Sequence, residues 1–120
     1  AIYTCLDEFD VDMYIGIGGA PEGVLAAAAI KCFDGQFQGR LVISNHDEKL
    51  RATKLGISDF SKKYYLNDMV KGGVIFCAAG VTDGELLKGI EINKNFFTSE
   101  ILSLHSKEKI IKKYQEKIEI

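Results

Sequence analysis

The chain has 120 residues, 47% of them hydrophobic and 27% charged, and a formal net charge of -2. This composition is typical of one ordinary globular domain and excludes a disordered or fibrous chain. The weak negative charge offers no basic face for nucleic acid, and no apolar run reaches the roughly 20 residues that span a bilayer, so we expect a cytoplasmic protein with no nucleic-acid or membrane partner.

The first segment, residues 1–9, predicts a short helix or the end of one. The chain begins with Ala1 rather than Met, inside an apolar stretch, which suggests an excised domain or a trimmed product. Residues 11–17 then combine β-branched, aromatic and other apolar side chains, a pattern that predicts the first strand.

A glycine-dense turn follows this strand, and Pro21 stands where a helix can begin because its missing N–H is not needed there. The helix is predicted to run to about Phe33, with Gly35 as its C-cap. Backbone N–H groups in such a turn, together with the helix dipole, form a seat for a phosphate oxygen, and Gly18 and Gly19 allow close approach.

Glu22 falls in the first turn of this helix, where its carboxylate would repel a bound phosphate. A divalent cation between them removes the conflict, because Mg²⁺ is commonly held by one or two carboxylates plus phosphate oxygens. Alternatively, Glu22 only complements the helix dipole, a contribution of about 0.3–1 kcal/mol. Residue type and spacing leave both interpretations open.

The middle of the chain predicts alternating strands and helices. Residues 38–44 are predicted to form a second strand. Asn45 is predicted to cap a helix that ends at Gly56, with Glu48 completing a capping box. The few apolar positions of this helix predict that it covers one face of a sheet. Residues 63–66 form a short strand candidate, followed by a turn over residues 67–73.

Residues 74–79 are continuously apolar, which predicts a central strand buried on both faces. A second small-residue turn follows, where Thr82 and Glu85 have capping-box spacing and predict a short helix over 85–88. Thr82 and Asp83 are therefore interpreted as structural capping residues.

The last third predicts an antiparallel pair, residues 89–93 with residues 96–106, joined by a turn at 93–95. The composition of residues 109–120 fits a helix or a half-buried edge strand. Together these elements predict an α/β fold, a mixed β-sheet flanked by helices, as a single domain over residues 1–120.

The cysteines and histidines give no sign of a redox or metal motif. Cys5, Cys32 and Cys77 are widely spaced beside apolar neighbours, so we expect reduced, buried thiols. His46 and His105 lack the spacing typical of zinc sites, and we expect structural or surface roles for both.

Three stretches resemble the class II (GlpX-type) fructose-1,6-bisphosphatases. The longest is Asp10-Val-Asp-Met-Tyr-Ile-Gly-Ile-Gly-Gly-Ala-Pro-Glu-Gly-Val24, and it is similar to the family signature. Gly80-Val-Thr-Asp-Gly-Glu-Leu-Leu87 is similar to a second marker, and residues 98–107 resemble a run near the C-terminus of the family. Ala79, Ser99 and His105 stand where many members have Thr, Thr and Arg.

The resemblance implies the C-terminal portion of a phosphatase with the lithium-sensitive, metal-dependent fold, whose active site lies between two domains. It implies that Glu22 is a ligand for Mn²⁺ or Mg²⁺ and that Gly19 contacts the substrate through its backbone. The other metal carboxylates would lie upstream of Ala1, in an absent N-terminal domain, and no catalytic residue is assigned here. The same likeness favours a strand over residues 109–120.

The implied reaction is hydrolysis of the 1-phosphate of fructose-1,6-bisphosphate, and in some members of the family also of sedoheptulose-1,7-bisphosphate, in gluconeogenesis or glycerol metabolism. We expect a homo-oligomeric enzyme, and we expect the isolated chain to be inactive because it supplies only one well-placed metal carboxylate.

Two other functions are compatible with parts of the sequence. Gly16 and Gly18 open a dinucleotide-binding fingerprint, with Asp47 as a ribose-binding carboxylate, but its last glycine position holds Pro21 and Glu22 would face the pyrophosphate. The chain could also be a sugar-phosphate-binding module without catalysis.

Overall fold

A computed structural model describes residues 1–119 of the protein. Two short 3₁₀ helices, η1 (Ile2–Cys5) and η2 (Asp7–Phe9), open the chain where a short helix was predicted. Helix α1 (Ala20–Cys32) follows the glycine-dense turn, with Gly19 as its N-cap and Pro21 in its first turn, as the sequence predicted.

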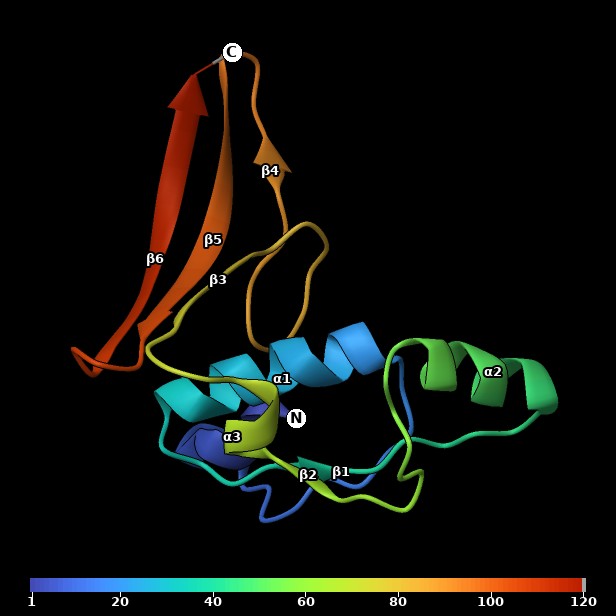
Figure 1. Ribbon diagram of the computed structural model, residues 1–120. Coiled ribbons are helices and arrows are strands. Elements are labelled where there is room, and N and C mark those ends of the chain that lie inside the picture. Colours follow the sequence, from blue (N-terminus) through green and yellow to red (C-terminus); the bar gives the residue numbers. More distant parts are fainter. Residues whose placement is uncertain (120) are drawn as a thin grey trace.

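The C-terminal half forms a four-stranded antiparallel sheet. Its strands are β3 (Ile75–Ala79), β4 (Glu91–Ile92), β5 (Phe96–His105) and β6 (Ile110–Glu119). Since β6 pairs with every residue of β5, strands β3 and β4 share the opposite edge of β5 (Figure 1). The predicted pairing of residues 89–93 with 96–106 and the terminal strand are both confirmed.

Helix α1 packs against one face of this sheet and forms the core with it. Ala29 and Cys32 of α1 are buried against Leu102 and Leu104 of β5. Alanines at the contact have almost no side chain to hold the helix away from the sheet, so the backbones approach closely. The α/β class is confirmed, and every strand pair within residues 1–119 is antiparallel.

The remaining elements lie on the other side of α1. Strand β1 (Gln38–Gly39) pairs with β2 (Tyr64–Tyr65), which leads directly into α3 (Leu66–Met69), where a turn was predicted. Helix α2 (His46–Lys54) connects β1 to β2, and Asn45 accepts a hydrogen bond from the Glu48 backbone N–H at 2.9 Å, as predicted.

Two predicted strands are wrong or too long. Residues 11–17 are not part of any sheet, and the strand predicted over residues 38–44 is reduced to the two residues of β1. Both segments have the composition of strands, but a strand forms only where a partner satisfies its backbone. Within residues 1–119 the first segment finds no partner, and the second finds one, β2, only for Gln38 and Gly39.

Three predictions about packing are also wrong. Strand β3 is an edge strand whose burial alternates, so only Phe76 and Ala78 are partly covered. Helix α2 projects to the side and covers no face of the sheet (Figure 1), since its apolar residues are few and only Ala52 is buried. Residues 85–88 form no helix: residues 85–87 are bends, and the Gly84 N–H donates to the Leu87 carbonyl at 3.0 Å.

The end of α1 differs from the prediction by one residue. Asp34, with φ 56°, adopts the left-handed conformation expected for Gly35. The Gly35 N–H donates to the Ile30 carbonyl at 3.0 Å and the Asp34 N–H to the Lys31 carbonyl at 3.3 Å, which is the Schellman pattern. Gly35 has a packing role instead, because a Cβ there would lie 2.8 Å from Ile30 Cγ2 and 2.9 Å from Cys5 Sγ.

The cysteines are all free, but only Cys32 is buried; Cys5 is half-buried and Cys77 is exposed. Burial raises the pKa of the Cys32 thiol. The prediction of three buried thiols is therefore wrong for Cys77, whose side chain lies on the uncovered face of the edge strand β3. Among residues 1–119, every helix is too short or too polar to cross a membrane.

Candidate metal and phosphate site

The start of α1 carries the two predicted site residues, Gly19 and Glu22. Gly19 has φ -65° and ψ 148°, an extended conformation that any residue can adopt, and its carbonyl accepts from the Gly23 N–H at 3.0 Å. No side chain caps this helix end, so the N–H groups of the first turn remain available. They provide the donors that anions bind at helix N-termini.

The side chain of Glu22 folds back over Gly19. Its carboxyl carbon lies 3.0 Å from the position that a Cβ on Gly19 would occupy. Gly19 therefore accommodates the Glu22 carboxylate, which occupies the space that a Cβ would fill. By contrast, nothing lies within 4 Å of the corresponding position on Gly18.

The Glu22 carboxylate is a suitable ligand for a hard divalent cation. It is exposed and has no hydrogen-bond or ion-pair partner in the part of the chain that the structure describes. Within residues 1–119 no group of three His, Cys, Asp or Glu side chains could hold a metal ion together. Glu22 thus fits as one ligand of a site that needs further oxygen ligands from elsewhere.

Other polar residues singled out from the sequence serve the structure. The Asp83 carboxylate accepts from the Gly89 N–H at 2.9 Å, which holds the loop between β3 and β4 and agrees with the structural interpretation, although no helix follows. His46 is exposed at the start of α2, and His105 Nδ1 lies 3.3 Å from a carboxylate oxygen of Glu108. Neither histidine lies in a cluster with metal-binding potential among the described residues.

Residues 1–118 match the family model described as "Bacterial fructose-1,6-bisphosphatase, glpX-encoded". The chain belongs to this family. It is 38% identical over 130 residues to fructose-1,6-bisphosphatase 1 class 2 of Escherichia coli strain K12, and 36% identical over 129 residues to fructose-1,6-bisphosphatase class 2 of Haemophilus influenzae. Each match covers 96% of this chain but only 38% of the relative.

Family membership confirms the resemblance found in the sequence and argues against the dinucleotide-binding alternative. That alternative also needs a sheet strand before the glycine turn, and residues 11–17 pair with no strand in residues 1–119.

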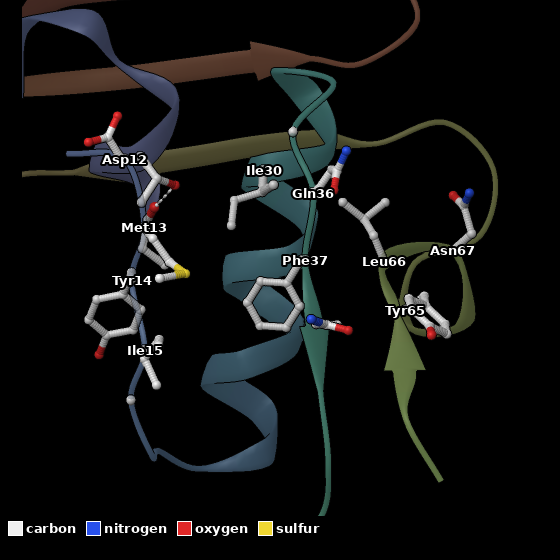
Figure 2. A pocket seen from close by; sticks show the side chains of 15 residues that line it. Asp12, Met13, Tyr14, Ile15, Ile30, Gln36, Phe37, Tyr65, Leu66 and Asn67 are labelled. Carbon is white, nitrogen blue, oxygen red and sulfur yellow. Dashed lines mark hydrogen bonds between the residues drawn. The ribbon is translucent and has the colours of Figure 1, made fainter. Parts of the chain in front are cut away.

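Sequence reasoning missed one feature near the site, an open groove beside α1. Residues 12–16 and 36–38 line it, and Figure 2 shows Asp12 to Ile15 on the side opposite to Phe37. A partial signal existed, because residues 11–17 and residues 38–44, which begin at the groove, both have the composition of strands.

Proposed function

We propose that this chain supplies one metal ligand, Glu22, and one substrate contact, Gly19, to a phosphatase that hydrolyses the 1-phosphate of fructose-1,6-bisphosphate. Sedoheptulose-1,7-bisphosphate is a second substrate of the same chemical class. The observation that carries the proposal is the unpaired Glu22 carboxylate lying over Gly19 at the uncapped start of α1. Membership in the glpX-encoded family supports it.

The residues have complementary roles at this helix end. The first-turn N–H groups of α1 attract a phosphate oxygen, and the absence of a Cβ at Gly19 leaves room for the Glu22 carboxylate beside them. Glu22 would hold Mn²⁺ or Mg²⁺, which supplies charge stabilisation at the phosphoryl oxygen and activation of water when bound. The negative charge of Glu22 would otherwise repel the phosphate, so the carboxylate and the substrate are compatible only with a cation present.

The chain by itself supplies one carboxylate, so we propose that the rest of the metal site comes from sequence that the relatives carry outside the matched region. The complete enzyme is proposed to be a homo-oligomer. The isolated chain is expected to bind sugar phosphate weakly, if a cation is present, and not to turn it over. Turnover of fructose-1,6-bisphosphate by the purified 120-residue chain would contradict the proposal that part of the metal site comes from outside this chain.

The proposal is tested in a chimera in which this chain replaces the matched region of the Escherichia coli class 2 enzyme. Glu22→Gln keeps the volume but removes the charge, so activity should fall by orders of magnitude and be restored only in part by extra Mn²⁺ or Mg²⁺. The matched control is Asp47→Asn, because Asp47 is an exposed carboxylate in the first turn of α2. If Glu22→Gln keeps near-normal activity, as the control should, then Glu22 does not bind the metal and only complements the helix dipole.

A further inference from the structure

An open groove of about 930 Å³ runs along α1. In Figure 2 the segment carrying Asp12 to Ile15 forms one side, the strand carrying Phe37 forms the other, and Ile30 of α1 lies between them. The long walls of this groove are therefore two lengths of extended backbone, and its floor is a helix.

The wall formed by residues 12–16 has no backbone partner. Residues 11–17 run as an extended chain and make no backbone hydrogen bond with any other part of residues 1–119. Extended backbone normally satisfies its N–H and C=O groups in a sheet, since leaving them unpaired away from water costs free energy. This wall is thus an open strand edge.

The opposite wall is open for a different reason. The Leu66 N–H donates to the Phe37 carbonyl at 3.0 Å, which directs the backbone groups of Phe37 toward β2. Because successive residues of a strand direct these groups to opposite edges, those of Gln36 and Gln38 face the groove. The groove therefore lies between two open edges.

The first wall also exposes large apolar side chains. Met13, Ile15 and Ile17 are 72%, 83% and 88% exposed. A run of exposed apolar residues on an unpaired strand edge promotes association, so folded proteins normally cover such edges.

The relatives indicate what covers it. They carry most of their length outside the region that this chain matches, since the matched region is 38% of each. We propose that the groove receives an extended segment from that other part of the class 2 protein, which adds as a β-strand and hydrogen-bonds to residues 12–16 and to Gln36 and Gln38. Strand addition of this kind takes its affinity from backbone hydrogen bonds. The inserted strand would fix the segment that leads into Gly19 and Glu22.

The test is amide hydrogen exchange, which does not depend on phosphatase activity. The 120-residue chain alone is compared with the chimera described above. Every second amide of residues 12–16, on the edge that faces the groove, and the amides of Gln36 and Gln38 should exchange at least about ten-fold more slowly in the chimera, because they become hydrogen-bonded. The matched control is the loop over residues 57–62, which is mostly exposed and lies outside the groove, and its exchange should not change.

Fast exchange of the groove amides in the folded chimera would overturn the proposal. Protection that appears in the chain alone as its concentration rises would also overturn it, since the occupant would then be a second copy. If the chimera does not fold, the same measurement is made on the Escherichia coli enzyme itself. There, slow exchange at the residues aligned with 12–16 supports the inserted strand, and fast exchange rejects it.

Discussion

The Lys109 ammonium group binds both carboxylate oxygens of Asp34, a residue 75 positions earlier in the chain. Asp34 lies just after the end of α1 and Lys109 in the turn between β5 and β6, and both have left-handed backbones, with φ 56° and 53°. The ion pair thus joins the end of the helix to the end of the long hairpin.

Removing either charge should cost little stability, because the two side chains are 56% and 71% exposed. A double-mutant cycle with Asp34→Asn and Lys109→Asn, both tolerant of the left-handed conformation, should give a coupling of about 0.2–1 kcal/mol. Urea unfolding measures it, and the coupling should shrink in high salt. A coupling that salt does not change would contradict an electrostatic origin.

Gly35→Ala should destabilise the chain by about 1–3 kcal/mol, because the new methyl group would overlap buried Ile30 and the Cys5 sulfur. Gly23→Ala is the matched control, since nothing lies within 4 Å of a Cβ there, and alanine in a helix interior gains about 0.5–1 kcal/mol over glycine. Thermal unfolding of both variants checks the opposite signs. Equal effects would show that Gly35 has no special packing role.

Gly19→Ala tests whether the two site residues act independently. The sequence alone suggested that Gly19 affects substrate and Glu22 affects metal. In the structure a methyl group on Gly19 would displace the Glu22 carboxylate, so in the chimera this variant should raise both the KM for the substrate and the cation concentration needed for activity. Gly23→Ala, with open space around its Cβ and outside the glycine turn, should change neither. If Gly19→Ala changes only the KM for the substrate, then Gly19 and Glu22 act independently.

Glu100 should make stability dependent on pH. A hydrogen bond from the Lys88 N–H, at 2.8 Å, holds the pKa of its carboxyl below the usual value, partly opposed by burial and aided by the Lys113 charge. A carboxyl whose pKa is lower in the folded state stabilises the protein above its unfolded pKa, about 4.3, and loses this contribution as the pH falls through the folded value.

Glu100→Gln should therefore lower the free energy of unfolding at pH 7 and have little effect well below pH 4, where the natural carboxyl is also neutral. Glu91→Gln is the control, since Glu91 is exposed and makes no side-chain hydrogen bond or ion pair within residues 1–119. Urea unfolding across this pH range measures the difference. A Glu100→Gln effect that is constant with pH would exclude the charged form as its source.

The sequence by itself determined the helices and strands that are specified by residues within or next to them. Pro21 and the glycine turn define the start of α1, Asn45 with Glu48 defines the start of α2, and the apolar pattern of residues 96–105 defines β5. The signature around Glu22 was enough to find the family, because it preserves residue types in a fixed order. The pairing of Glu22 with Gly19 was not visible, since it depends on how one side chain folds back.

Only the tertiary structure decided which strands have partners. Residues 11–17 and 74–79 both have strand composition, yet one pairs with nothing in residues 1–119 and the other becomes an edge. Composition indicates that a segment can form a strand, but the hydrogen bonds that complete it come from a distant segment. The same reason explains Gly35. A Cβ at this position has no room, because Cys5, thirty residues earlier, and Ile30 in the buried face of α1 occupy the space.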